Sequence, residues 1–185
     1  MGFNNLLKSL FGDKSTRDMK QIRPIVEKVK AAYPEIKTLT NDQLRARTKG
    51  LQQQLQDAVK GQKEKIAELK VQIEGTPIDE REGIFSQIDK LEKDILDTYE
   101  VVLNEILPVA FSIMKDTARR FAENDEIVVT ANDFDRELAT TKDFVRIEDG
   151  KAIYSNHWIA GGNEMKWDMV HYDVQIFGGA VLLQG

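Results

Sequence analysis

Residues 169–185 read MVHYDVQIFGGAVLLQG, and this stretch decides how the rest of the chain is interpreted. It is mostly apolar, with one amide side chain, Gln175, after an aromatic residue and an acid, and with paired glycines behind it. A glutamine amide can pair with adenine twice, because its oxygen accepts from N6 and its nitrogen donates to N7. An amide in an apolar segment is also commonly a core or capping group. The residues alone leave both interpretations open.

The secondary structure of the same stretch is ambiguous by pattern. Ile176 to Leu183 could be a buried strand, and the glycine pair argues against a helix. Asp173 could instead cap a helix that begins at Val174.

Composition excludes several classes of protein. The chain has 185 residues, a net charge of −5 and no cysteine, so disulfide frameworks and thiolate metal sites are excluded. An acidic balance disfavours nucleic-acid binding. No apolar run is long enough to span a bilayer, and the first residues lack the features of a signal peptide. Residues 1–30 are nevertheless basic, with seven Lys and Arg against three acids, which indicates an anionic partner for this end.

The basic end carries an amphipathic pattern. Its apolar residues recur at helical spacing up to Gly12, and they are Phe3, Leu6, Leu7, Leu10 and Phe11. A helix this short needs a surface to be stable. Docking on its own protein is the common outcome, and the neighbouring bases favour a membrane surface as the alternative.

Helical periodicity continues through the next hundred residues. Capping boxes at Ser15–Asp18 and Thr40–Gln43 open helices, and Tyr33-Pro34 is expected to end the first of them. The second helix has weak points at Gly50 and Gly61. Residues 75–77, Gly-Thr-Pro, predict a turn into a returning helix, so that a two-helix antiparallel hairpin forms. The inward-facing residues are expected to be Leu44, Leu51, Leu55, Val59, Ile66, Leu69, Ile73, Ile84, Ile88, Leu91, Ile95, Tyr99, Val102 and Ile106.

Beyond the hairpin the pattern changes. Pro108 is expected to break the returning helix and restart it at a first-turn position. Short strands are predicted over 127–130, 144–147 and 152–155, with Glu148-Asp149-Gly150-Lys151 as a hairpin turn. Residues 160–163, Ala-Gly-Gly-Asn, are interpreted as a flexible connection.

Three blocks resemble the SecA family of preprotein-translocating ATPases. They are Leu6–Gly12 with the basic segment after it, Leu39–Thr48 continuing to Leu55, and Leu107–Arg120 together with the run Met-x-His-Tyr-Asp-Val-Gln-x-x-Gly-Gly at 169–179, which is similar to the family's adenine-recognising Q motif. The stretches of about 60–105 and 122–168 are longer than is usual in the family. We interpret them as a lengthened helical hairpin and a small β-rich appendage, and neither inherits a function from the resemblance.

The resemblance implies specific roles. Gln175 would contact N6 and N7 of adenine, and Met169 and Tyr172 would flank the ring. Val170 replaces a usual Arg. Gly178 and Gly179 would allow close helix packing, and the segment would be helical.

Other catalytic chemistry is not evident. The P-loop signature G-x-x-x-x-G-K-[ST] does not occur in the 185 residues, so no catalytic residue is assigned and the chain alone should not hydrolyse ATP. His157 and His171 lack ligand-like spacing, and no metal site is assigned. Trp158 and Trp167 are interpreted as core or edge residues. The acids Asp133 and Asp135, like Asp125 and Glu126, are expected to be solvated surface.

The sequence therefore predicts a mainly α protein with a small β insertion (α+β), formed by a long antiparallel helical hairpin and the N-terminal edge of a helicase-like nucleotide-binding domain. The expected divisions are an amphipathic helix at 1–12, helices at 13–59, the inserted hairpin at 60–106, a helix at 107–122, the β-rich appendage at 123–166 and the Q-motif segment at 167–185.

The function implied by the resemblance is that of the N-terminal part of an ATP-driven motor, ending before the P-loop. The implied cofactor is ATP with Mg²⁺ held by parts beyond Gly185. The implied partners are the Sec membrane channel, anionic phospholipid and preproteins, with a homodimer left open and no nucleic acid. The implied location is the cytoplasm, at the inner face of the cell membrane. The alternative is a stand-alone helical coiled-coil module that binds partners without catalysis.

Overall fold

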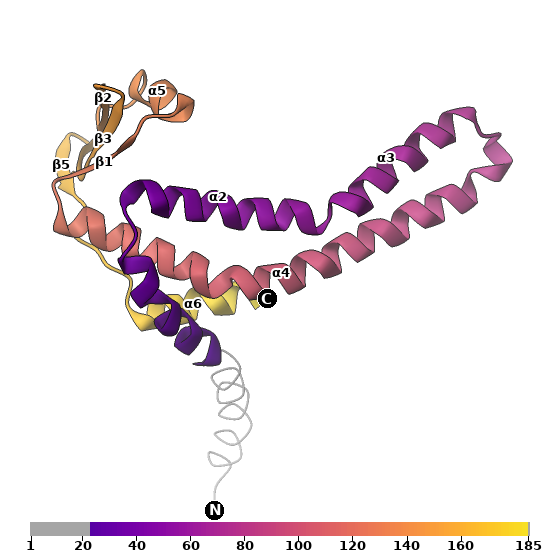
Figure 1. Ribbon diagram of the computed structural model, residues 1–185, viewed down its shortest axis with the longest axis horizontal. Helices are drawn as coiled ribbons and strands as arrows, with labels where there is room; N and C mark the ends of the chain where they lie inside the picture. Colours follow the sequence, from indigo (N-terminus) through magenta and orange to yellow (C-terminus); the bar gives the residue numbers. More distant parts are fainter. Residues whose placement is uncertain (1–22, 185) are drawn as a thin grey trace, which may run out of the picture. The chain divides into compact units, whose positions relative to one another are not determined.

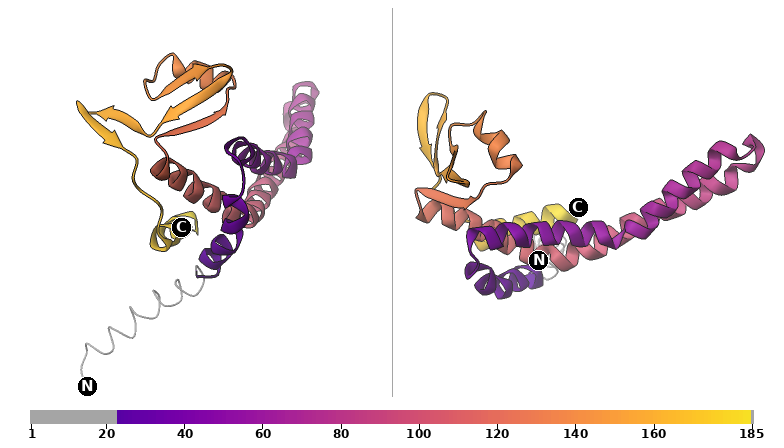
Figure 2. Two further views of the ribbon diagram at one scale, coloured as in Figure 1. Left: turned by 60° about the vertical axis from the view of Figure 1, so that its left-hand side comes forward. Right: turned by 45° about the horizontal axis from the view of Figure 1, so that its top comes forward.

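The computed structural model describes residues 23–184, which form a mainly α chain with small antiparallel sheets (Figures 1 and 2). Two compact units divide it: Met1–Leu44 with Pro108–Gly185, called the first unit below, and Arg45–Leu107, called the hairpin unit. The described elements are a helix over 23–37, α2 Asn41–Ala58, α3 Lys60–Gly75, η1 Ile78–Glu80, α4 Glu82–Glu123, β1 Glu126–Thr130, α5 Asp133–Ala139, β2 Val145–Glu148, β3 Lys151–Ser155, β4 His157–Ala160, β5 Asn163–Lys166 and α6 Asp173–Gln184.

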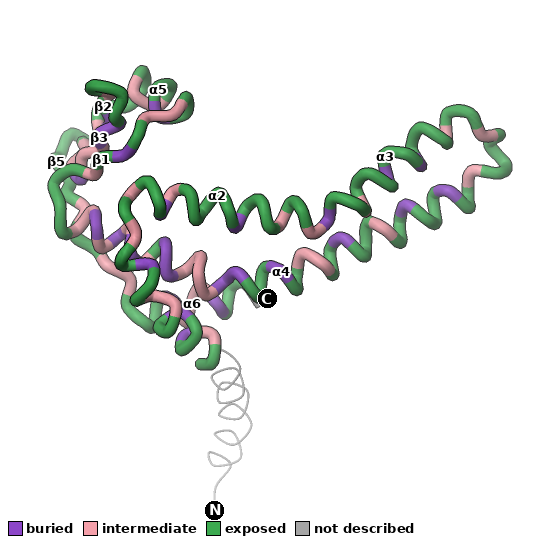
Figure 3. Tube along the Cα trace, in the orientation of Figure 1, coloured by how far each residue is buried: buried purple, intermediate pink, exposed green. Residues whose placement is uncertain are grey.

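The hairpin unit confirms the predicted antiparallel pair. Helix α3 ends at Gly75, Thr76 caps it in an extended conformation, and the chain returns through η1 into α4. Aliphatic side chains from both arms form one buried cluster, with Val59, Ile66, Leu69, Ile84, Ile88 and Ile95 inside and Ile73, Leu91 and Tyr99 packed against it. Figure 3 shows the buried positions recurring along α3 and along the returning part of α4.

The first arm of the hairpin breaks at Val59, which the sequence predicts as an inward-facing residue but not as a break. The capping box of Thr40 and Gln43 is present, with Thr40 N–H donating to the Gln43 side chain over 2.8 Å. Helix α2 then ends at Ala58, and Val59 leaves helical geometry at φ −115° and ψ 8° before α3 begins. The predicted weak points, Gly50 and Gly61, lie inside helices with open space around them. Val59 is fully buried, so packing fixes the break.

Both predicted proline boundaries are wrong. The first described helix runs through Pro34 to residue 37, and α4 runs through Pro108 without interruption. A proline inside a helix costs a hydrogen bond. Burial on either side offsets that cost, since Ile36 is 1% exposed and Ile106, Leu107 and Ile113 are all buried.

A buried polar network ties α4 to the start of α2. Arg120 donates to Asp116 over 2.6 Å, to the Asn41 side chain over 2.7 Å and to the Leu39 carbonyl over 2.6 Å. Asp116 is fully buried and also binds Arg119 over 2.8 Å. The network satisfies every charge that it buries, as a low-dielectric interior requires.

The predicted β-hairpin is present. Strand β3 lies between β1 and β2, antiparallel to both, over a core of Val129, Val145 and Ala152. Asp149 and Gly150 make the turn with φ of 47° and 75°, the left-handed conformation of a two-residue hairpin loop. The sheet is anchored to the first turn of α2, because Asp42 accepts from both the backbone N–H and the hydroxyl of Thr130 over 2.8 Å.

Three further elements of the appendage correct the sequence analysis. Residues 160–163 are the turn of a second hairpin, β4 with β5, in which Gly161 and Gly162 take positive φ. Helix α5 was not predicted, and Asn132 and Asp135 cap it reciprocally. Asp135 is therefore fully buried instead of solvated, and it also accepts from the Tyr154 hydroxyl.

Candidate functional site

The candidate site begins with the segment that leads into α6. Trp167 fixes this segment to α4, because its indole N–H lies 3.1 Å from the Ala118 carbonyl and 2.8 Å from the Met169 carbonyl. Helix α6 starts four residues after Met169, one residue earlier than the sequence suggested. The helical interpretation of residues 173–184 is thus confirmed, and the strand alternative is wrong.

Gln175 is exposed in the first turn of α6. Its Oε1 accepts a hydrogen bond from the Tyr172 backbone N–H over 2.8 Å, while the Tyr172 carbonyl accepts from the N–H of Ile176. This is half of a capping box, with Tyr172 at the cap position and Gln175 three residues later. The backbone thereby fixes which end of the amide is the oxygen. No described residue accepts from its NH₂ group.

The two residues predicted to flank a ring are differently placed. Tyr172 is 72% exposed and lines an open hollow of about 680 Å³ with Lys115, Asp168, Val170, His171, Asp173 and Val174. Met169 is 51% exposed and is not among the lining residues, nor is Gln175. A hydrogen bond therefore links Tyr172 to Gln175, whereas Met169 lies on the segment that precedes α6.

Sequence reasoning missed the ionic contacts that hold the start of α6. Asp173 lies 3.4 Å from the Lys30 ammonium and 3.5 Å from that of Lys115. The hydrogen bond with Asp173, aided by Glu27, raises the pKa of Lys30. Lys115 also lies over the Tyr33 ring, 5.7 Å from its centre. These residues come from three separate helices, so no spacing in the sequence relates them.

The opposite side of α6 is packed into the first unit. Ile176 and Ala180 are buried against Val26 and Val29, with Phe111 and Phe177 packed around them. A Cβ on Gly179 would lie 3.1 Å from the Phe111 ring, which confirms the predicted close approach at this glycine. Gly178 has open space around it, so the prediction fails there.

Clusters of metal-ligating side chains and membrane-spanning helices are both absent from the described residues. No group of three or more His, Asp or Glu side chains within 23–184 is placed to hold a metal ion. None of the helices in this range combines the length and apolar character needed to cross a bilayer. The amphipathic residues Phe3, Leu6, Leu7, Leu10 and Phe11 lie outside the described range.

Comparison with known proteins gives the family. The family model of the SecA DEAD-like domain matches residues 7–185. The protein translocase subunit SecA of Phocaeicola vulgatus is 62% identical over 186 residues, which is 100% of this chain and 17% of that protein. The subunit of Parabacteroides distasonis is 60% identical over 100% of the chain and 16% of its own length. The subunit of Flavobacterium psychrophilum is 45% identical over 98% of the chain and 16% of its own length. No solved structure matches.

These alignments also bear on the two long stretches outside the resembling blocks. Because the alignment with the Phocaeicola vulgatus protein covers all 185 residues in 186 positions, the hairpin and the β-rich appendage both have counterparts there. The chain spans about a sixth of the length of these relatives. On the match of almost every residue to the family model, and on identities of 45% to 62% along the chain, this protein belongs to the SecA family.

Proposed function

We propose that this chain is the N-terminal part of a SecA-type motor, which uses ATP to move preproteins across the cytoplasmic membrane through the Sec channel. Family membership supports the motor, because the relatives are named as protein translocase subunits. The exposed amide of Gln175, oriented by the Tyr172 N–H at the start of α6, is the observation that carries the role of this segment. That role is recognition of the adenine of ATP.

The geometry suits adenine better than guanine. Oε1 has a second lone pair beyond the one used by Tyr172, and it can accept from adenine N6 while Nε2 donates to N7. Guanine presents an oxygen where adenine presents the N6 amine. Turning the amide to suit guanine would break the hydrogen bond from Tyr172. The backbone contact therefore makes the Gln175 side chain selective for adenine over guanine.

The remaining parts of the reaction are assigned elsewhere in the motor. ATP phosphates and Mg²⁺ are held by a P-loop and an acidic partner in enzymes of this kind, and residues 1–185 contain no such signature. The adenine contact alone supplies at most two neutral hydrogen bonds and ring contacts with Tyr172 and Met169. The 185-residue chain by itself should therefore bind ATP feebly and hydrolyse none.

Two substitutions at Gln175 separate its capping role from its adenine role. Gln175→Glu keeps an oxygen for the Tyr172 N–H and removes the NH₂ donor, whereas Gln175→Ala removes both. In the larger protein that carries this chain, Gln175→Ala should weaken ATP binding about tenfold to a hundredfold, since it removes two neutral hydrogen bonds. Gln175→Glu should also weaken it, since it keeps the contact with N6 but sets a carboxylate oxygen against the acceptor N7. Only Gln175→Ala should also lower the melting temperature.

The measurement is calorimetric titration of ATP and GTP into the wild type and both variants. Gln87→Ala is the matched control, since Gln87 is an exposed glutamine on α4 that binds only its own helix, at the Gly83 carbonyl. The preference for ATP over GTP should fall in Gln175→Ala, persist in Gln175→Glu, whose oxygen still faces the N6 amine, and stay unchanged in the control. If Gln175→Glu binds ATP as tightly as the wild type, the amide serves only as a cap.

The second part of the proposal places the basic N-terminal end at the membrane. Residues 1–30 carry the excess of bases, and the apolar residues between Phe3 and Phe11 repeat at helical spacing. Such a segment binds anionic lipid by insertion and by charge attraction, and salt weakens the second effect. The intact chain should float with anionic vesicles, and a chain without residues 1–12 should not. Equal flotation with neutral vesicles would contradict a role for the bases.

A second candidate function is a docking arm for protein partners, including a second copy of the chain. On α4 the exposed side chains Phe85, Leu96 and Leu103 are 50%, 67% and 39% exposed and are spaced by eleven and seven residues, which places them on one face. Sedimentation of the wild type and of Leu96→Lys tests self-association through this face. A monomer at all concentrations would exclude the homodimer.

A further inference from the structure

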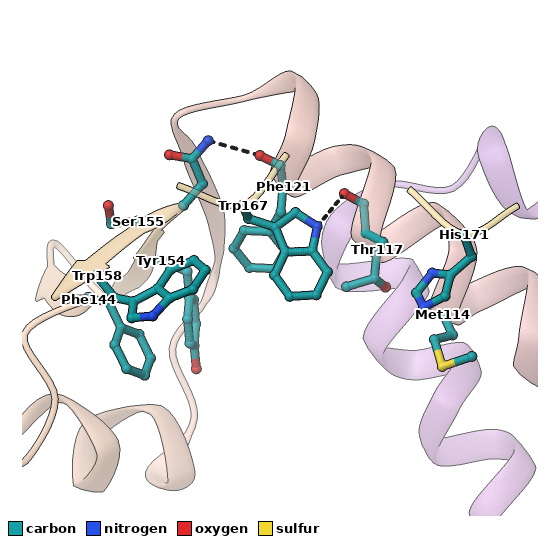
Figure 4. Close-up of a pocket in the computed structure, with 11 residues that line it drawn as sticks. Met114, Thr117, Phe121, Phe144, Tyr154, Ser155, Trp158, Trp167 and His171 are labelled. Carbon is teal, nitrogen blue, oxygen red and sulfur yellow. Dashed lines mark hydrogen bonds between the residues drawn. The ribbon is translucent and has the colours of Figure 1, made fainter. Parts of the chain in front are cut away.

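A large apolar pocket lies in the first unit (Figure 4). Its volume is about 660 Å³, within the range of sites for small molecules. The last turns of α4 form one wall, and Phe144 just before β2, strands β3 and β4, and the segment before α6 form the others. The lining residues are Met114, Thr117, Ala118, Phe121, Phe144, Tyr154, Ser155, Asn156, Trp158, Trp167 and His171.

The lining is aromatic and carries no formal charge. Five of the eleven residues are Phe, Tyr or Trp, and none is Lys, Arg, Asp or Glu, although such residues make up 31% of the chain. In Figure 4, Phe144, Tyr154 and Trp158 gather on one side, and Phe121 and Trp167 stand in the middle. All five are only half-buried. A phosphate or carboxylate would find no cation here, whereas a flat apolar ring would find several faces to stack on.

Two buried polar atoms of the pocket-lining residues lack hydrogen-bond partners. Asn156 Oδ1 and His171 Nδ1 are the buried side-chain polar atoms of the described residues that have no hydrogen bond, and both residues line the pocket. Asn156 is 1% exposed, and its Nδ2 donates to the Phe121 carbonyl over 3.0 Å, so its amide cannot turn without losing that bond. Buried polar atoms usually have partners. An incoming N–H or O–H group would supply one.

We infer that this pocket binds a neutral, flat aromatic molecule of two or three rings with one hydrogen-bond donor, which pairs with Asn156 Oδ1. The site differs from the proposed adenine site in its lining, which lacks Gln175, Tyr172 and Met169, and it shares only His171 with the hollow beside Tyr172. It is also independent of the proposed function: the pocket can bind its ligand whether or not Gln175 binds ATP.

The chain's own tryptophans can report the binding of a ligand in this pocket. It has two tryptophans, Trp158 and Trp167, and both line the pocket. N-phenyl-1-naphthylamine is a neutral three-ring probe with one N–H donor, and it accepts energy from tryptophan. Titrating it into the 185-residue chain should quench tryptophan emission and raise probe emission, with saturation at one site. Absence of saturable binding would overturn the proposal.

Two relatives of the probe test its chemistry without altering the protein. 1-Benzylnaphthalene replaces the N–H by a methylene, and it should bind about threefold to tenfold more weakly, the value of one neutral hydrogen bond. 1-Anilinonaphthalene-8-sulfonate adds an anion that the pocket cannot pair, and it should bind at least tenfold more weakly. Equal affinity of either compound and the probe would overturn the proposed ligand class.

A pair of matched variants places the probe. Thr117 lines the pocket and donates to the Ile113 carbonyl over 2.8 Å, and Thr98 makes the same contact with Asp94 over 2.7 Å on the hairpin part of α4. Thr117→Phe should fill the pocket and lower probe affinity at least tenfold, whereas Thr98→Phe should leave it unchanged. If Thr117→Phe does not fold, the relative affinities of the three probes for the wild-type chain still test the proposal. Exclusion of the probe in the larger protein would show that protein covers the pocket, and would overturn a small-molecule site.

Discussion

The hairpin unit and the first unit bury different kinds of residue. The core of the hairpin is aliphatic throughout, from Val59 to Ile95. Every described residue that is both buried and polar or charged lies in the first unit: Ser112, Asp116, Arg120, Asp135 and Asn156. Helix α4 belongs to both, so a single helix changes from an apolar to a polar packing partner along its length.

The difference teaches which forces fix each region. An aliphatic stripe is tolerant of replacement, because any apolar side chain of similar volume preserves it. A buried ionic network requires particular partners, since removing one leaves an uncompensated charge. We therefore expect the first unit to be far less tolerant of substitution at its buried positions than the hairpin, and changes at Asp116 and Ile88 test that expectation.

The largest effect should come from Asp116→Ala. Asp116 is fully buried between Arg119, at 2.8 Å, and Arg120, at 2.6 Å, and its loss leaves Arg120 buried without a counter-charge. The expected loss in the free energy of unfolding is about 3–5 kcal/mol. Urea denaturation followed by circular dichroism measures it.

The control for this change is Asp125→Ala. Asp125 pairs with Lys166 over 2.9 Å, a distance like that of the buried pair, but its side chain is 77% exposed. Its loss should cost far less stability than the loss of Asp116, because solvent screens the exposed pair. Replacing Asp116 and Arg120 together by Leu should cost less than the sum of the single changes. Additive losses would show that the two residues do not act as a pair.

The next effect concerns the hairpin. Ile88→Ala removes a side chain that is 6% exposed in the aliphatic cluster, and should cost about 2–4 kcal/mol through lost burial and a cavity. Leu91→Ala should cost less, because Leu91 is only partly buried. Ile88→Leu should be nearly neutral, which is the tolerance that separates this core from the buried network. Equal losses in Ile88→Ala and Ile88→Leu would contradict it.

The contrast also explains what could be read from the sequence. The hairpin was predictable, with its turn at 75–77 and all its inward residues, because an aliphatic repeat has one physical meaning. The prolines were misread, since local propensity gives way when buried residues such as Ile36 and Leu107 lie beside them. The burial of Asp135 and the network around Arg120 were missed, because each joins elements far apart in sequence.

The candidate site was predictable only in part. The resemblance supplied Gln175, Tyr172 and Met169, and the structure adds the hydrogen bond between the first two. Lys30 and Lys115 at Asp173, and the aromatic pocket, follow from the packing of separate helices and strands. Nothing in the local sequence around these charged and aromatic residues indicates that they contact one another in the folded chain.

A smaller and opposite effect should come from Gly50→Ala. Gly50 lies inside α2 with nothing near the position of an added Cβ, and alanine narrows the unfolded ensemble. The substitution should stabilise the chain by about 0.4–1 kcal/mol, measured by the same urea denaturation. Gly150→Ala is the matched control. Its backbone has φ of 75°, so alanine there should destabilise the β-hairpin. A loss of stability in Gly50→Ala would mean that the α2 backbone is not helical there.

The smallest effect separates exposed charge pairs from the buried network. Arg146 donates to both oxygens of Glu126, over 2.7 and 3.2 Å, across the surface of the sheet. That hydrogen bond lowers the pKa of Glu126 from its ordinary 4.5. A lowered folded-state pKa means that the stabilisation is complete above pH 4.5 and is lost as the pH falls through the folded value. Because the pair is exposed, the loss should be smaller than that from Asp116→Ala or Ile88→Ala. Carbon-detected NMR titration of the Glu126 carboxyl measures its pKa, which should return toward 4.5 in Arg146→Ala and in high salt. An unchanged pKa in both conditions would show that Arg146 does not pair with Glu126 in solution.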